Sequence, residues 1–181
     1  MELKESMRSQ GEFLFRHRSY LPLLLGFLAI FSLQSIRPEM LSTFWEESRD
    51  VAALLVCLLG VLVRCATVGF VPERTSGRNT SKQVASTLNT TGMYSLVRHP
   101  LYLGNYLILL GFTLFFESLW LTGVSSLAFW LYYERIMLAE ESFLRSRFGV
   151  QFAEWASRTP AFVPRLSGWQ SPALPFSILT V

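Results

Sequence analysis

Two short polar clusters in this chain contain the residue types that can do chemistry. The first is Arg98-His99-Pro100-Leu101-Tyr102-Leu103-Gly104, and the second is Glu140-Glu141. Two apolar stretches, 101–116 and 119–138, lie between them. If these stretches form a helical hairpin across a bilayer, both clusters return to the same face of the membrane. Together they outline a site for a polar cofactor beside a lipid.

Each charged side chain of the clusters has a functional and a structural interpretation. The helix that follows His99 begins with unpaired N–H groups, which favour a carboxylate or a phosphate, and His99 can donate or accept hydrogen bonds there. Arg98 alone could be a basic anchor at the interface. Glu140 and Glu141 could bind a ribose hydroxyl or a cationic ligand, or could begin a solvated surface helix. Adjacent helical residues point about 100° apart, so we expect one glutamate to face the site and the other to orient it.

Further charges lie within the apolar stretches. Glu134 and Arg135 precede the glutamate pair, and Arg64 lies near the end of an earlier apolar segment. Charges inside a membrane span are costly and are usually functional or paired. An ion pair between Arg64 and Glu134 is the structural interpretation. Arg135 is the candidate for binding the anionic head of a substrate.

The composition is that of a membrane protein. The 181 residues are 51% hydrophobic and 16% charged, whereas soluble domains carry about a quarter charged residues. The net charge of +3 is modest and forms no evident basic face with interleaved aromatics, so nucleic acid is not an expected partner. Two cysteines and two histidines without a CxxC motif predict no metal site. We expect one domain, 1–181, with a two-span N-terminal region over 1–70 and a catalytic core over 71–165.

The apolar segments set the fold class. They cover 20–36, 51–70, 101–116 and 119–138, and a transmembrane helix needs roughly 17–25 residues. The third reaches that length only if its helix starts near Arg98, where Pro100 suits the first turn. The sequence therefore predicts an all-α polytopic membrane protein with about four transmembrane helices, the last two forming a tight hairpin. Buried soluble helices could mimic one or two such segments. Apolar spacing over 140–158 adds an amphipathic C-terminal helix.

Basic residues predict the orientation. They gather before the first span, after the second and after the fourth, which places both termini in the cytoplasm. These residues are Lys4, Arg8, Arg16 and Arg18, then Arg74, Arg78, Lys82 and Arg98, then Arg145, Arg147, Arg158 and Arg165.

The motifs and their order carry a family resemblance. Gly92-Met93-Tyr94, the cluster from Arg98 to Gly104, Glu140-Glu141-Ser142-Phe143-Leu144 and Phe148-Gly149 follow one another along the chain. This order resembles the isoprenylcysteine carboxyl methyltransferase family, which belongs with the membrane phospholipid methyltransferases. The resemblance covers roughly residues 75–165. Members of that family are small helical membrane enzymes that use S-adenosylmethionine (SAM).

The resemblance implies a set of site residues. It implies that this chain contacts SAM through Thr87, Leu88, Asn89, Tyr94, His99, Pro100, Leu101, Tyr102 and Glu140. We expect catalytic roles for Arg98, His99 and Glu141, and a substrate-binding role for Arg135.

The expected reaction follows from these residues. Methyl transfer from a sulfonium is an in-line displacement that needs alignment above all. We expect SAM-dependent methyl transfer to the anionic carboxylate or phosphate head of a lipid or lipidated substrate, at the cytoplasmic face of the membrane. A phospholipid amine is the second candidate acceptor, and it would have to be neutral before attack. Two different functions also fit the sequence: an NADPH-dependent enzyme similar to sterol reductases, and a non-catalytic membrane scaffold.

Overall fold

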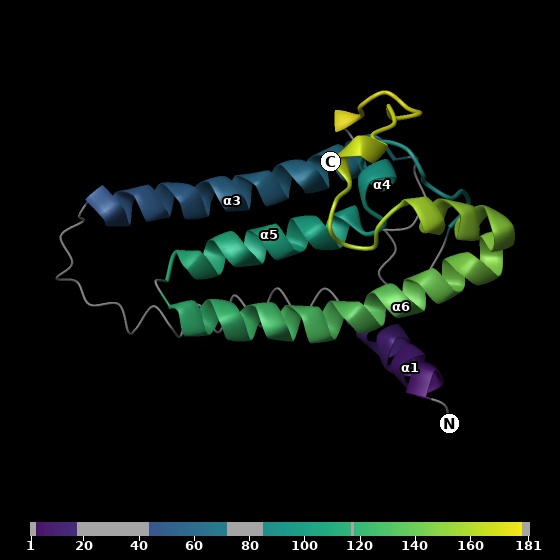
Figure 1. The fold of residues 1–181 in the computed structure, drawn as a ribbon, viewed down its shortest axis with the longest axis horizontal. Coiled ribbons are helices and arrows are strands. Elements are labelled where there is room, and N and C mark those ends of the chain that lie inside the picture. Colours follow the sequence, from purple (N-terminus) through teal and green to yellow (C-terminus); the bar gives the residue numbers. More distant parts are fainter. Residues whose placement is uncertain (1–2, 18–43, 72–84, 117, 179–181) are drawn as a thin grey trace.

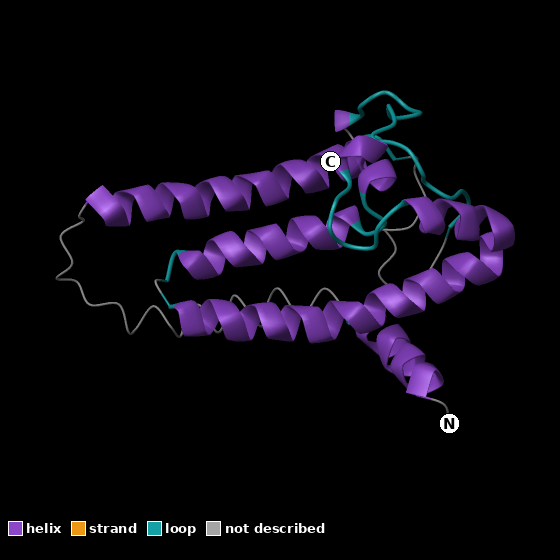
Figure 2. Ribbon diagram, in the orientation of Figure 1, coloured by secondary structure: helices purple, strands orange, loops and turns teal. Residues whose placement is uncertain are grey.

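A computed structural model describes residues 3–17, 44–71, 85–116 and 118–178. Every regular element in these ranges is helical (Figure 2), so the predicted all-α class is confirmed for them. The helices are α1 (Leu3–Arg16), α3 (Phe44–Gly69), α4 (Met93–Leu96), α5 (Pro100–Leu114) and α6 (Leu119–Arg158), and a 3-10 turn covers Leu166–Gly168. The predicted first span, 20–36, lies outside the described residues.

Helix α3 has the properties of a membrane-spanning helix. Ser48–Gly69 is both long and apolar enough to cross a bilayer, and among the described helices it alone meets both conditions. One side of α3 packs on α5 through small residues: Ala53 is buried, and a side chain at Gly60 would collide with the Gly104 carbonyl. The other side exposes Leu54, Leu58 and their neighbours. A helix with an exposed leucine face of this kind suits contact with lipid.

Helices α5 and α6 form a hairpin as predicted, but neither is both long and apolar enough to count as a membrane span, and α5 has only 15 residues. Pro100 occupies the first turn of α5 with His99 as its N-cap residue, where the missing N–H of proline costs no hydrogen bond. Ser118 caps α6 by accepting a hydrogen bond from the backbone N–H of Leu121 at 3.2 Å. Buried aromatic residues, Tyr102 of α5 with Phe129 and Tyr133 of α6, fill the space between the two helices. The hairpin thus returns the chain to the end at which it entered (Figure 1).

The C-terminal helix differs from the prediction. Instead of a separate helix over 140–158, α6 continues for 40 residues from Leu119 to Arg158. Gly149 interrupts it with φ +52°, a left-handed conformation that favours glycine. Figure 1 shows α6 bending sharply there and its last turns running back toward α4. This kink places the end of α6 next to the start of α5.

The N-terminal segment, expected only as a charged tail, forms helix α1 and packs across α6 (Figure 1). Gly11 permits this crossing, because a Cβ there would collide with the backbone carbonyl of Arg135. Phe15 is buried against the hairpin core, and the hydroxyl of Tyr132 donates to the carbonyl of Leu14 at 3.1 Å. Helix α1 is therefore a packed part of the fold.

Candidate functional site

The two polar clusters meet at one end of the α5–α6 hairpin, as the sequence predicts. His99 lies between the two glutamates of α6: its Nε2 is 3.1 Å from Glu141 Oε1 and its Nδ1 is 3.5 Å from Glu140 Oε2. The hydroxyl of Tyr102 donates to Glu140 Oε1 at 2.8 Å. The glutamates point in different directions from the helix, yet one imidazole reaches both because it has a nitrogen on each side. We call His99, Tyr102, Glu140 and Glu141 the carboxylate cluster.

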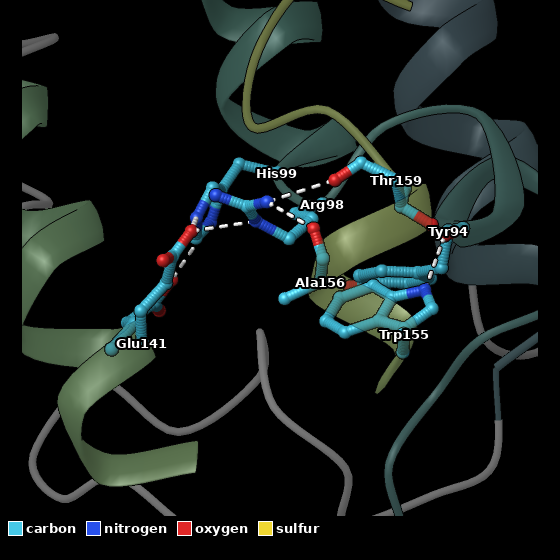
Figure 3. Close-up of polar contacts among 8 residues, drawn as sticks. Tyr94, Arg98, His99, Glu141, Trp155, Ala156 and Thr159 are labelled. Carbon is cyan, nitrogen blue, oxygen red and sulfur yellow. Dashed lines mark hydrogen bonds and ion pairs between the residues drawn. The ribbon is translucent and has the colours of Figure 1, made fainter. Parts of the chain in front are cut away.

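Arg98 connects the carboxylate cluster to the end of α6 (Figure 3). Its Nε donates to Glu141 Oε1 at 2.8 Å. Its Nη1 donates to two carbonyls, Ala156 at 2.9 Å and Thr159 at 2.8 Å, where the last turn of α6 has acceptors without partners in the helix. This guanidinium therefore holds Glu141 and the helix end together, which makes Arg98 a positioning residue in this geometry.

The electrostatics of the carboxylate cluster favour its charged forms. Burial disfavours the imidazolium of His99, but the hydrogen bonds and charges of Glu140 and Glu141 outweigh burial and raise the pKa of His99 above its ordinary value. For Glu141, burial favours the neutral acid, but His99 and Arg98 outweigh it and lower the pKa of this carboxyl. The cluster therefore favours a protonated His99 beside an ionised Glu141.

A C-terminal strap, residues 159–178, covers the loop that leads into α5. The backbone N–H groups of Arg98 and His99 donate to the carbonyls of Pro160 at 2.8 Å and Ala161 at 3.3 Å. Farther along the strap, Gln170 accepts from the N–H of Gly92 at 2.9 Å. The sequence predicts only an irregular tail here, because backbone bonds between distant segments leave no periodic signal.

Apart from His99, Tyr102 and Glu140, the residues implied to contact a cofactor lie on this loop and on the first turn of α5. Tyr94 is buried with Phe152 and Trp155, and the indole Nε1 of Trp155 donates to the Tyr94 carbonyl at 3.1 Å (Figure 3). Leu88 packs against the same group, while Thr87 is exposed. Pro100 is fully buried at the start of α5, and the next residue, Leu101, is half-buried.

Asn89 differs from its neighbours in this loop. Its Nδ2 is buried and has no hydrogen-bond partner within the described ranges. A buried amide without a partner costs free energy, and such a group in a folded protein calls for an explanation. The sequence could not have predicted this, because neither the residue type nor its spacing shows whether Nδ2 has a partner.

Arg135 does not join the carboxylate cluster. Its Nε donates to Gln10 Oε1 of α1 at 2.9 Å, and its Nη1 donates to the carbonyl of Leu131. Glu140, in contrast, bonds to Tyr102 of α5. The substrate-binding role expected of Arg135 therefore has no geometric support from proximity to the cluster.

A second polar chain links three helices, and the sequence does not predict it. Arg64 of α3 donates to Asn105 Oδ1 of α5, in place of the ion pair with Glu134 that the sequence suggests. Asn105 in turn donates to the hydroxyl of Tyr133 of α6 at 3.2 Å. A neutral amide satisfies Arg64 here because Gly104, one residue away, allows the arginine side chain to pass close to α5. Asn105 belongs to no motif that would have predicted this contact.

Comparisons with known proteins identify the family of this chain. Residues 48–151 match the phospholipid methyltransferase family. The cobalt-zinc-cadmium resistance protein CzcN of Cupriavidus metallidurans is 48% identical over 116 residues, which are 62% of this chain and 51% of CzcN. The nickel-cobalt-cadmium resistance protein NccN of Alcaligenes xylosoxydans is 40% identical over 130 residues, 70% of this chain and 57% of NccN.

A more distant relative bears the name of a specific enzyme. The protein-S-isoprenylcysteine O-methyltransferase of Schizosaccharomyces pombe is 28% identical over 133 residues, 70% of this chain and 54% of that enzyme. The chain spans about half the length of the curated relatives it matches. The family match itself runs from α3 through α5 to the glutamates of α6. Because it covers more than half of the sequence, this chain belongs to the phospholipid methyltransferase family.

Proposed function

We propose that this protein transfers a methyl group from SAM to the polar head of a lipid or lipidated molecule at the membrane surface. The observation that carries the proposal is His99 held between Glu140 and Glu141 at the end of an apolar helical hairpin. Family membership supports methyl transfer, and the exposed leucine face of α3 supports a lipid environment. In this proposal 71–165 forms the catalytic core of one domain, and 1–70 supports it.

The residues beside the carboxylate cluster fit SAM. SAM offers a carboxylate, an amino group, ribose hydroxyls and an adenine ring, so its site needs both donors and acceptors. The buried amide of Asn89 is a donor with no partner in the described chain, and Glu140 is an acceptor for a hydroxyl or an amino group. Tyr94 and Leu88 provide the apolar wall that an adenine ring requires. When bound, SAM supplies an electrophilic methyl group on a sulfonium.

The chain's own residues would align and shield that methyl group. Arg98 fixes Glu141, and Glu141 with Glu140 fixes the ring of His99. Tyr102 holds Glu140 from the first turn of α5. The carboxylates raise the pKa of His99, and the protonated form that they favour cannot accept a proton from the substrate. The arrangement suits a transfer that depends on alignment rather than on proton abstraction.

The class of acceptor is the open part of this proposal. The sequence favours an anionic carboxylate or phosphate, which is ionised near neutral pH and needs no base. That preference depends on Arg135, which contacts α1 instead. Arg98 and His99 both contact the glutamates of the carboxylate cluster, so cations offset its negative charge. The labelling experiment below therefore decides between the anionic acceptor and the second candidate, a phospholipid amine.

Cytoplasmic SAM would set the orientation. A soluble polar cofactor reaches only the cytoplasmic end of the hairpin, which places the carboxylate cluster there. Both termini follow on the same side under the positive-inside rule.

Calorimetry of SAM binding to the detergent-purified full chain tests this function. We expect saturable binding by wild type and by Glu154→Gln, a control on an exposed position of α6, and its loss in Glu140→Ala and His99→Ala. Asn89→Ala should also lose affinity but keep the melting temperature, because its Nδ2 has no hydrogen-bond partner among the described residues. Well-folded wild type that binds NADPH but no SAM would refute the proposal and support a reductase. Binding of neither in lipid nanodiscs would support a scaffold.

Transfer of labelled methyl from SAM into lipid extracts then identifies the acceptor. Methyl esters of carboxylates release methanol in alkali, whereas methyl phosphodiesters and N-methyl groups do not. Alkali-labile label would support the carboxylate acceptor. Alkali-stable label recovered as a methylated amine after acid hydrolysis would support the amine, and alkali-stable label without such a product would support the phosphate.

A further inference from the structure

Arg135 interrupts an apolar face of α6. Leu127, Leu131 and Leu138 share this face, since they lie eight and four residues before and three residues after Arg135. Their exposed fractions are 59%, 48% and 41%, so the face is open to the surroundings. A cation on a lipid-facing stripe is costly unless an anion accompanies it.

The described part of the protein supplies no such anion. The two groups that accept hydrogen bonds from Arg135 are the side-chain oxygen of Gln10 and the backbone carbonyl of Leu131, and both are neutral. No carboxylate among the described residues forms an ion pair with this guanidinium. Within the described ranges the arginine is therefore oriented by neutral bonds, and no carboxylate pairs with its charge.

A hollow lies beside Arg135, between α1 and α6. Its volume is about 580 Å³. Polar side chains (Ser9, Gln10 and Arg135) and apolar ones (Phe13, Leu14, Ala128, Leu131 and Tyr132) line it together. The walls are fixed relative to each other, because Gly11 sits against the backbone of Arg135 and Tyr132 bonds to Leu14.

We propose that this hollow binds an anionic phospholipid of the surrounding bilayer. The phosphodiester pairs with Arg135 and accepts hydrogen bonds from Ser9, and the acyl chains lie along Leu131 and Leu127. The apolar stripe that continues from the hollow argues for a lipid over a soluble anion. This site is separate from the carboxylate cluster, since Arg135 bonds to α1 while Glu140 bonds to α5. The proposal does not depend on methyl transfer.

Native mass spectrometry of the detergent-purified full chain tests it, with dioleoyl phosphatidylglycerol and dioleoyl phosphatidylcholine as the two probes. A charge-assisted pair predicts that wild type retains the anionic lipid about tenfold better than the zwitterionic one. Arg135→Gln should abolish this preference, and Arg135→Lys should retain part of it. Arg147→Gln, a control on an exposed position of the same helix, should behave as wild type.

Three results would overturn the proposal: equal retention of both lipids by wild type, an unchanged preference in Arg135→Gln, or displacement of the anionic lipid by millimolar inorganic phosphate, which would indicate a soluble ligand. If Arg135→Gln has no melting transition and is therefore unfolded, the salt dependence of lipid preference in wild type tests the proposal instead. The preference for the anionic lipid must then fall as NaCl rises, because salt screens the pair, and a constant preference would refute the site. SAM binding, measured in parallel, separates this outcome from a failure of the proposed function.

Discussion

Replacing Glu141 with glutamine tests whether charge holds the carboxylate cluster together. Glu141 Oε1 accepts from Arg98 Nε at 2.8 Å and lies 3.1 Å from His99 Nε2. The side chain of His99 is 4% exposed and that of Glu141 is 21% exposed, so water screens these contacts only in part. Glutamine keeps the shape and an acceptor oxygen but removes the negative charge.

The expected loss of stability follows from these two contacts. A hydrogen bond to a charged group contributes about 1 kcal/mol more than a neutral one. Two such contacts give a loss of about 2 kcal/mol in the free energy of unfolding. For a protein of this size that corresponds to a fall in Tm of about 4–8 °C.

The pH dependence has a definite sign. The lowered pKa of Glu141 means that its contribution is present above the ordinary carboxyl pKa and is lost as pH falls through the folded value. The raised pKa of His99 means that its contribution is present below the ordinary imidazole pKa and is lost as pH rises through the folded value. Both stabilising contributions, that of Glu141 and that of His99, are fully present between about pH 4.3 and 6.5. The difference in Tm between wild type and Glu141→Gln should be largest in that window.

Outside the window the Tm values of wild type and Glu141→Gln should approach each other, fully in acid and only in part in alkali. In acid, a protonated Glu141 resembles glutamine, so the difference in Tm should vanish. In alkali, His99 is neutral but Arg98 keeps its charge, so part of the difference should persist. Intrinsic tryptophan fluorescence during heating measures the difference in Tm at acid and at alkaline pH, with Glu154→Gln as the control. A difference below about 1 °C at about pH 5–6, or one that grows toward alkaline pH, would refute the ionised cluster.

Four other substitutions, one of them a matched control, test the fold around the site by the same melting assay. Gly149→Ala should destabilise by about 1–2 kcal/mol because φ is +52°, whereas Gly123→Ala, in open space within regular helix, should stabilise by about 0.5–1 kcal/mol; equal effects would contradict the left-handed kink. Gly104→Ala should cost about 1–3 kcal/mol, since its Cβ would lie 2.9 Å from a backbone oxygen of α3, and a wild-type Tm would disprove the close helix crossing. Trp155→Phe should cost about 1–3 kcal/mol by removing the buried hydrogen bond from the indole to the Tyr94 carbonyl, and an unchanged Tm would show that this bond does not stabilise the fold.

The sequence predicts the hairpin and the meeting of the clusters because both depend on local signals. Pro100 marks a helix start, and a short break separates two apolar stretches. Two antiparallel helices joined by a short loop must bring together the ends that lie away from the loop. The role of Gly104 needs the structure. The motif alone assigns no role to this glycine, whereas in the fold it lets α3 approach α5. A small residue at a helix crossing and one beside a cofactor look alike in a single sequence.

The same limit explains why the sequence does not place Arg135 or the end of α6. The surroundings of Arg135 depend on α1, which packs on the same face of α6. The sequence signals α1 only weakly, because Met7, Gly11 and Leu14 recur at helical spacing among charged neighbours. The sequence predicts a continuing surface helix through Phe148-Gly149, but the glycine turns the chain back so that Ala156 and Thr159 offer carbonyls to Arg98. Through Arg98 this bend determines where Glu141 lies. The glycine of the motif therefore acts on the candidate site from a distance, so substituting it should weaken SAM binding as well as stability.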